Sequence, residues 1–482
     1  MHKSKITLFA LLTVASSVFA QDEITLSKAQ YEDLLRRIER LEAAEKVDAT
    51  TGASPQKPDT ISTEKSKKER KHLSREAGGF TIGGYGEAVL TRNFYSDNIN
   101  RYSKAAQYKD AVSNGQVDLP HVVLMLGYDF GRGWSFGSEI EFEHGGTESA
   151  VEMEDEEFGE WEKEIERGGE VALEQFWIQK SFGDAINIRL GHDVVPVGYT
   201  NAHHLPTEFF TVYRPEGENQ ILPCTWHQTG ISIWGRTKHM RYQIMGLPGL
   251  NSHYFSKDSW IKYGSASSFE FTPANKYAAA ARFDFYPVDG LRLGVSGYYG
   301  HSFNNTLQSD ESGKYKNVKG AVGIGTFDFE YKCRYARIQG NADYGHLSDA
   351  EIISSYNRMQ SSTSPYKRTL VGDQAWCASL QAGLDVFSFS DKLFERNQRL
   401  FVFAAYEYYD AYNPAGSNSD YKWTERHRLA VGVNYYPLKD VVIKAEFSER
   451  FLHEQYNNEP SVSLGVCYAG FFNLDRKVKR NN

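Results

Sequence analysis

The sequence has no run of about twenty apolar residues, the length that a membrane-spanning helix requires. The apolar segment at residues 6–14 is too short to cross a bilayer. Elsewhere, apolar residues alternate with polar ones in stretches of about ten residues. If this chain spans a membrane, it does so with β-strands that close into a barrel.

Cysteine is also scarce. The four cysteines (Cys224, Cys333, Cys377 and Cys467) lie far apart and form no Cys-x-x-Cys pair, which argues against a disulfide framework or a zinc site. The formal net charge of −8 argues against a general nucleic-acid binder. We therefore expect a protein without a metal ion, a cofactor or a nucleic-acid partner.

The alternation is clearest where two stretches flank a tight turn. Phe283 and Phe285 share one face of a predicted strand, and Arg282 and Asp284 share the other. Residues 288–290 reverse the chain, and residues 291–299 alternate again. The 30 tyrosines and 29 phenylalanines can supply the aromatic girdles of a membrane barrel. This patterning predicts an all-β transmembrane fold, an antiparallel outer-membrane β-barrel.

Three segments precede the alternating part of the chain. Residues 1–20 combine early lysines, an apolar run and a small-residue cleavage site, which predicts a signal peptide for export to the outer membrane of a diderm bacterium. Residues 21–46 place Leu34 and Ile38 on a heptad seam, which predicts a short periplasmic coiled coil; an isolated amphipathic helix is the alternative. Residues 47–78 are rich in Thr, Ser, Pro and Lys and predict a flexible periplasmic linker.

The β-barrel domain is predicted to span residues 79–472, followed by a basic tail at 473–482. About sixteen strands, with both termini periplasmic, would give a barrel wide enough to hold an aqueous channel. The predicted strands are residues 80–91, 119–130, 134–144, 172–182, 185–191, 228–236, 239–247, 277–286, 291–301, 319–331, 334–345, 374–389, 399–409, 426–436, 441–451 and 461–472.

With the apolar face of each strand toward lipid, many charged residues point into the lumen. Acids on one arc and bases on the others would produce a field across the pore that orients dipolar solutes. The alternative is that these charges pair across neighbouring strands and only solvate the wall. The predicted lumen charges are Glu139, Glu141, Glu143, Arg282, Arg292, Arg337, Arg428 and Lys444.

The segment 192–227 is long and too apolar for a loop in water. Its valines, leucines and phenylalanines predict that it folds into the barrel mouth and narrows the channel. A metal site at its adjacent histidines is disfavoured, because neighbours in an extended segment point apart and no third ligand follows at helical spacing. The predicted constriction residues are Arg189, Asn201, His203, His204, Glu208, Arg214 and Glu216.

Another external segment, residues 152–170, is strongly acidic and reads "EMEDEEFGEWEKEIERGGE". Such runs are usually solvated faces. The alternatives are a cation-attracting vestibule, or a contact with anionic lipopolysaccharide that divalent cations bridge.

The densest part of the pattern, residues 119–235, resembles the phosphate-selective porin O and P family, and in particular its Bacteroidetes branch of outer-membrane porins. The resemblance is carried by "DLPHVVLMLGYDF", "SFGSEIEFEHGG", "LEQFWIQKSFGDAINIRLGHDVVPVGYTNAHHLPTEFFTVYRPEGENQILPCTW" and "QTGISIWG". It implies a homotrimer that forms a passive, water-filled channel for small hydrophilic solutes or ions, without enzymatic activity. In that family, basic residues and an inward-folded loop favour anions, and Arg189 and Arg214 are most similar by position. The glutamates along residues 139–143 depart from this arrangement.

Two other functions remain open at this point. A plugged structural or adhesin-like barrel would fill its lumen, and the inward-facing Val123 and Met125 could pack such a plug. A barrel hydrolase would need a Ser, His and acid arrangement, usually in a narrower barrel.

Overall fold

The computed structural model describes residues 79–471, except for the short stretches 111–112, 145–148, 158–159, 168–170, 268–269, 308–312, 362–366 and 415–418. The predicted signal peptide, coiled coil and linker (1–78) and the basic tail (473–482) lie outside the described residues.

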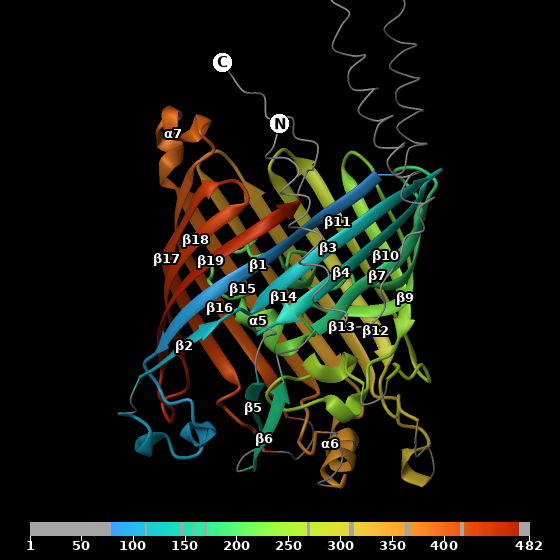
Figure 1. Cartoon of the computed structure of the whole chain (residues 1–482). Helices are drawn as coiled ribbons and strands as arrows, with labels where there is room; N and C mark the ends of the chain where they lie inside the picture. Colours follow the sequence, from blue (N-terminus) through green and yellow to red (C-terminus); the bar gives the residue numbers. More distant parts are fainter. Residues whose placement is uncertain are drawn as a thin grey trace, which may run out of the picture. The chain divides into compact units, whose positions relative to one another are not determined.

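Seventeen of the described strands form one closed antiparallel sheet (Figure 1). β1 pairs with β19 from Gly83↔Phe471 to Asn93↔Ser461, which closes the barrel. The sheet contains 17 strands. β2 and β3 pair with different parts of β1 and together form one staggered edge beside it, so the barrel has the width of 16 strands. The strands are β1 (Gly79–Asn93), β2 (Asn114–Asp118), β3 (His121–Gly131), β4 (Trp134–Glu143), β7 (Val171–Ser181), β8 (Asn187–Val194), β9 (His227–Arg236), β10 (Met240–Pro248), β11 (Tyr277–Val288), β12 (Leu291–His301), β13 (Ala321–Lys332), β14 (Ala336–Leu347), β15 (Gln374–Asp385), β16 (Arg399–Asn413), β17 (Glu425–Leu438), β18 (Val441–Phe451) and β19 (Glu459–Phe471).

The two ends of the barrel carry different connections. Most connections at the top of Figure 1 are short turns, and the one after β15 carries η7 (Val386–Phe389) and α7 (Asp391–Glu395). Longer segments lie at the bottom and include a separate hairpin, β5 (Ser149–Glu157) with β6 (Glu160–Arg167). Among the described residues, no helix is long and apolar enough to cross a membrane. The small helices of the long connections are η2 (Ile99–Tyr102), η3 (Ala105–Gln107), η4 (Ser252–Tyr254), η5 (Lys262–Ser265), η6 (Gly313–Tyr315) and α6 (Ala350–Arg358).

Side chains alternate between an apolar outer surface and a buried inner surface. In β13, Val322, Asp328 and Glu330 point inward and are at most 9% exposed, whereas Phe327 on the outer face is 47% exposed. The same alternation leaves leucine, valine and phenylalanine side chains exposed along most strands. Such an apolar belt is stable against lipid rather than water, so the fold is a transmembrane β-barrel.

All sixteen predicted strands are confirmed, and the ranges 291–301 and 441–451 are identical to β12 and β18. The predicted strand 119–130 begins at His121 because Pro120, which has no N–H to donate, separates it from β2. β15 ends earlier than predicted because the Asp385 carboxylate accepts hydrogen bonds from Phe387 N and Leu400 N and turns the chain. The prediction missed β2 and the β5–β6 hairpin, whose acidic sequence was interpreted as a solvated loop.

The largest apolar core lies inside the barrel, toward the end with the long connections. Inward-facing residues of β10 to β16 contribute to it together with four connecting segments. Gly345 leaves room for one of these segments, since a Cβ there would lie 2.0 Å from the Trp260 ring. This core leaves the polar part of the lumen to the remaining strands and to the opposite end. Its large members include Leu222, Trp226, Met245, Phe255, Trp260, Phe303, Leu347 and Ile353.

Candidate functional site

Residues 195–226, between β8 and β9, form a segment that we call the inserted loop. It contains α4 (Tyr199–Ala202) and α5 (Glu216–Ile221), and α5 is drawn within the barrel in Figure 1. Every residue of the segment is buried or half-buried. The apolar side chains that the sequence predicted to need burial are covered, with Phe209, Phe210 and Leu222 each 1% exposed. Covering each of these side chains contributes about 1.5–3 kcal/mol.

Side chains of the barrel wall bind the backbone of the inserted loop much as a neighbouring strand would. Four inward-facing residues of β15, β17 and β18 satisfy five backbone groups of residues 209–212. Without these partners, the buried N–H and C=O groups would each cost free energy. The contacts are Lys444 Nζ to Phe209 O (3.1 Å) and Thr211 O (2.8 Å), Asn434 Nδ2 to Phe210 O (3.0 Å), Phe210 N to Gln381 Oε1 (2.9 Å) and Val212 N to Glu446 Oε2 (2.8 Å).

Glu216 fixes the first turn of α5 to the wall. Arg450 donates two hydrogen bonds of 2.7 Å to its carboxylate, Arg428 Nε lies 3.1 Å from it, and the Tyr409 hydroxyl donates a third hydrogen bond at 2.9 Å. Burial alone would raise the pKa of Glu216, but Arg450 and Arg428 lower it below its ordinary value. Glu216 is therefore ionised in a site that two cations surround.

Glu218 fixes the other helix of the inserted loop. Its carboxylate accepts the backbone N–H groups of Tyr199 and Thr200 at 3.0 Å and so caps α4. Burial, reinforced by Asp343, raises the pKa of Glu218 well above its ordinary value. Gly198 lies directly against this carboxyl, with a φ of 84°, and a Cβ there would lie 1.7 Å from Glu218 Oε1.

The predicted basic lumen residues point inward, and each has a partner. Arg282 and Arg292 both bind Asp284 and Asp328, and Arg282 also donates to Gly198 O at 2.9 Å. The other partners are Glu330 and the carbonyls of Thr207 and Glu208 for Arg337, Glu407 and Glu446 for Arg428, and loop carbonyls for Lys444. These cations hold the wall and the inserted loop together, so they do not stand free in an open lumen.

The predicted acids lie on the opposite arc. Glu139 and Glu141 of β4 are each 3% exposed, and Glu174 of β7 beside them is 1% exposed. His121 Nδ1 lies 2.6 Å from Glu141 Oε1, and Gln175 donates to Glu139. Acidic side chains thus line the inner face of β4 and β7.

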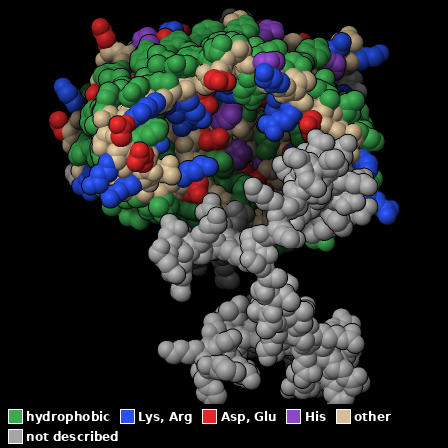
Figure 2. All heavy atoms as spheres, turned by 90° about the horizontal axis from the view of Figure 1, so that it is seen from above, with side chains coloured by type: hydrophobic (Ala, Val, Ile, Leu, Met, Phe, Trp, Pro, Cys, Tyr) green, Lys and Arg blue, Asp and Glu red, His purple; other side chains and the backbone are tan. Residues whose placement is uncertain are grey.

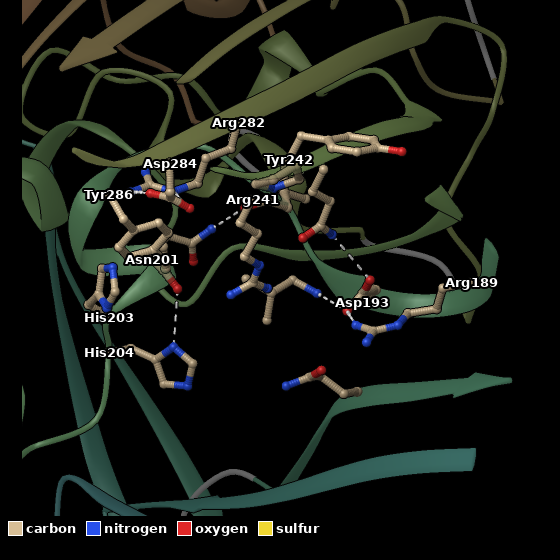
Figure 3. Close-up of a pocket in the computed structure, with 16 residues that line it drawn as sticks. Arg189, Asp193, Asn201, His203, His204, Arg241, Tyr242, Arg282, Asp284 and Tyr286 are labelled. Carbon is tan, nitrogen blue, oxygen red and sulfur yellow. Dashed lines mark hydrogen bonds and ion pairs between the residues drawn. The ribbon is translucent and has the colours of Figure 1, made fainter. Parts of the chain in front are cut away.

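A cavity of about 210 Å³ lies inside the barrel on the side of β7, β8, β10 and β11 (Figure 3). Arg189 is in it and binds Asp193 at 2.7 Å, and its guanidinium stacks on the Trp177 ring at 3.9 Å. Arg241 lies between this pair and the Arg282–Asp284 pair in Figure 3. Three arginines (189, 241 and 282) and two aspartates (193 and 284) line the cavity.

The structure does not bring all the predicted constriction residues together. Asn201, His203 and His204 line the same cavity as Arg189. Burial and the nearby Arg214 lower the pKa of His204 to about 4, so its imidazole is neutral near pH 7. The Glu208 carboxylate lies 3.5 Å from His203, while its backbone carbonyl accepts from Arg337 and Gln339. Arg214 does not line this cavity; it is 7% exposed and donates to Thr225 at 3.1 Å.

A second cavity, of about 280 Å³, lies among β13, β14, β16 and β17. Four cations line it (Lys332, Arg337, Arg399 and Lys439), and its lining contains no acidic residue. Figure 2 looks into the barrel from the top of Figure 1, where the short turns lie. Basic and acidic side chains surround the hollow in this view, and hydrophobic side chains cover the outside of the barrel.

Sequence reasoning missed several residues of this site, notably Glu218, Glu174 and Asp328. Glu174 lies where the pairing register of β4 and β7 shifts, so the alternation of inward and outward residues does not predict that its side chain points inward. One Gly-x-Ser-x-Gly spacing is present at residues 133–137, but Ser135 lies within β4, paired with Asp129 and Gln179. A hydrolase of that motif class holds its serine at a sharp strand-to-helix turn instead.

No family model matches the chain. An uncharacterized protein of Aquifex aeolicus (strain VF5) is 26% identical over 391 residues, which cover 79% of this chain and 78% of that protein.

Solved structures with a similar barrel include an anion-selective porin from Comamonas acidovorans, with 11% identity and a TM-score of 0.47, over 82% of this chain and 100% of that one. Salmonella typhi OmpF, in complex with daunomycin, has 10% identity and a TM-score of 0.46, over 81% and 97%. The outer membrane channel DcaP of Acinetobacter baumannii has 9% identity and a TM-score of 0.43, over 82% and 98%. Similarity at this level does not bear on the solute.

Gly198→Ala should loosen the inserted loop. The added methyl group would collide with the Glu218 carboxyl, and alanine is strained at this positive φ, so we expect a loss of about 1–3 kcal/mol in the free energy of unfolding. Urea titration of the folded protein measures it. Gly323→Ala is the matched control, because a Cβ at Gly323 would meet nothing within 4 Å. Equal stability of the two variants would contradict this account.

Glu216→Gln should reduce stability in a pH-dependent way. A carboxylate whose pKa is lower in the folded than in the unfolded protein stabilises the fold above its unfolded pKa, and this contribution is lost as the pH falls through the folded pKa. Breaking this ion cluster should cost about 3 kcal/mol at pH 7. The difference from the unmodified protein should shrink below about pH 4, the ordinary range of a glutamate.

Chemical unfolding at pH 7 and pH 3 checks this expectation. Glu351→Gln, on the exposed face of α6, is the control and should show no such difference. The same effect of Glu216→Gln at both pH values would mean that its charge does not hold the loop.

Proposed function

We propose that the protein is an outer-membrane porin, a passive channel for small hydrophilic solutes or ions. The observation that carries this proposal is a closed barrel with an apolar exterior, whose interior is lined by charged side chains and crossed by the inserted loop. A barrel of this size has room for an aqueous path once its own side chains are accommodated. The signal peptide proposed from the sequence supports export to the outer membrane.

The inserted loop is the constriction in this proposal. Its contacts with β11, β12 and β14 to β18 hold it across the lumen, so a solute has to pass beside it. The apolar core occupies the side of β10 to β16 at the long-connection end. At this end of the barrel, the path for a hydrophilic solute therefore runs along β4, which carries Glu139 and Glu141.

We further propose a mild preference for anions, set at the end with the short turns. The cavities there are lined by more basic than acidic residues. One has three arginines against two aspartates. The other has four cations, three of which pair with Glu330 or Asp385 from outside the lining. Charges at a narrow site are screened less than those in a wide vestibule, where the Debye length is about 8 Å in physiological salt. The acids of residues 152–170 would then matter mainly at low ionic strength. A homotrimer held partly by residues 21–46 completes the proposal.

A plugged barrel is the second candidate, since the inserted loop also contacts the remaining wall. Tyr85 of β1 lies 5.8 Å from the His204 ring, and Leu205 packs against the cluster of Tyr85 and Val123. A barrel filled in this way would serve as a structural or adhesin-like protein. Planar-bilayer recording separates the two candidates, because an open porin gives stable ohmic steps and a plugged barrel gives none.

Replacing residues 203–215 by a Gly-Ser segment should raise the single-channel conductance. The change removes the part of the loop between α4 and α5 but keeps the anchors Glu216 and Glu218. Recordings in planar bilayers at high salt measure the effect. Deleting residues 154–166 of the separate β5–β6 hairpin is the control and should change conductance only at low salt. Unchanged conductance after the first replacement would place the narrow point elsewhere.

Arg189→Glu should shift the reversal potential toward cations. The substitution changes the cavity lining from three basic and two acidic residues to two basic and three acidic ones. A salt gradient across the bilayer gives the reversal potential directly. Lys422→Glu makes the same charge change in a long connection, where Lys422 is 49% exposed, and should have little effect at high salt. Equal reversal potentials for the unmodified protein and Arg189→Glu would remove Arg189 from the selective site.

A further inference from the structure

We propose that His121, Glu141 and Glu143 bind a divalent transition-metal ion in the lumen, at the end with the long connections. His121 begins β3 and Glu143 ends β4, so both lie at that end of the barrel. One ligand atom from each of the three residues lies within 4.8 Å of the others. This inference goes beyond the porin proposal and does not depend on a conducting channel.

The three residues come together because β3 and β4 pair in register. His121 lies directly opposite Glu143, and Glu141 follows two residues along on the same face of β4. His121 Nδ1 lies 2.6 Å from Glu141 Oε1. The imidazole side chain is 17% exposed and that of Glu141 is 4% exposed, so the site is largely shielded from water.

A separate observation points to a cation at this place. Glu174 is 1% exposed, its carboxyl group contacts that of Glu141, and its Oε2 atom has no hydrogen-bond partner. A buried carboxylate oxygen without a hydrogen-bond partner needs an explanation, and an ion or a water molecule bound beside it is one. A metal ion bound to Glu141 would place a positive charge beside this buried oxygen.

Two cationic side chains lie near the group: Arg214, and Lys262, which is in electrostatic contact with Glu143. Arg214 is in electrostatic contact with Glu87, Glu141 and Glu174, but it is one positive charge among several carboxylates. Its Nε and Nη2 atoms make no hydrogen bond to any of them. The basic arc differs, since Arg282 and Arg292 there balance Asp284 and Asp328 in direct ion pairs. At this place four carboxylates (Glu87, Glu141, Glu143 and Glu174) face two cationic side chains.

The donor set suits a particular class of ion. One imidazole and two carboxylates favour Zn²⁺ or a similar first-row ion over Ca²⁺ and Mg²⁺, which prefer oxygen ligands alone. Glu87 Oε1 lies 3.9 Å from His121 Nε2. A carboxylate at the second ring nitrogen of a metal-binding histidine usually orients the ring and increases its basicity.

Equilibrium dialysis of the detergent-purified full chain against Zn²⁺ tests the proposal, with isothermal titration calorimetry for the affinity. We expect one Zn²⁺ per chain at this site. His121→Ala and Glu143→Gln should each weaken binding about tenfold or more, because each removes a ligand. Glu143 lies at a strand end and is half-buried, so its variant should keep the fold even where His121→Ala does not.

His453→Ala is the matched control, because it breaks a histidine–glutamate pair of 2.7 Å in another long connection. It should leave Zn²⁺ binding unchanged. The inference is overturned if the unmodified protein binds no Zn²⁺ at micromolar concentration. It is also overturned if Glu143→Gln binds Zn²⁺ as tightly as the unmodified protein, or if His453→Ala removes the binding.

Discussion

The interior of this barrel depends on satisfying the backbone of a segment that has left the wall. Strand backbones bond to each other around the barrel, but residues 195–226 have no neighbouring strand in the lumen. Lys444 and Glu446 provide the missing partners, the first by donating to carbonyls and the second by accepting an N–H. The polar lining of β14 to β18 is thus a structural requirement of the inserted loop as well as a surface for solutes.

The same requirement explains why the charges are distributed unevenly. The basic arc faces the backbone carbonyls and the Glu216 carboxylate, so its arginines and Lys444 find partners. The acidic residues of β4 and β7 face a different part of the inserted loop, which presents Arg214 and the neutral His204 to them. The inward-facing arginines and Lys444 therefore lie where the loop presents carbonyls and a carboxylate.

Much of the fold could be predicted from the sequence, because lipid on one side of a strand forces a period of two. From that constraint, both ends of β12 and of β18 were predicted correctly. It does not apply to the acidic β5–β6 hairpin, which lies outside the closed sheet. The burial of the inserted loop also followed from its phenylalanines and valines.

The pairing inside the site could not be predicted in this way. Lys444 and Phe209 are 235 residues apart, and spacing along the chain carries no information about such a contact. The sequence predicts Arg189 and Arg214 to lie together at the constriction, because both are in or beside the loop. The structure instead puts Arg189 in the cavity with Asp193 and turns Arg214 toward the acids. Side-chain direction within an irregular segment depends on its tertiary contacts.

The long sequence separation of these contacts also affects the order in which the barrel folds. The loop follows β8 in the chain, but Gln381, Lys444 and Arg450 belong to β15 and β18, and the contacts span 171 to 235 residues. Until those strands join the sheet, the phenylalanines of the loop cannot pack against them, and the incomplete barrel carries an exposed apolar segment. Docking of the loop is consequently a late step in assembly, because it requires β15 to β18 to be in the sheet.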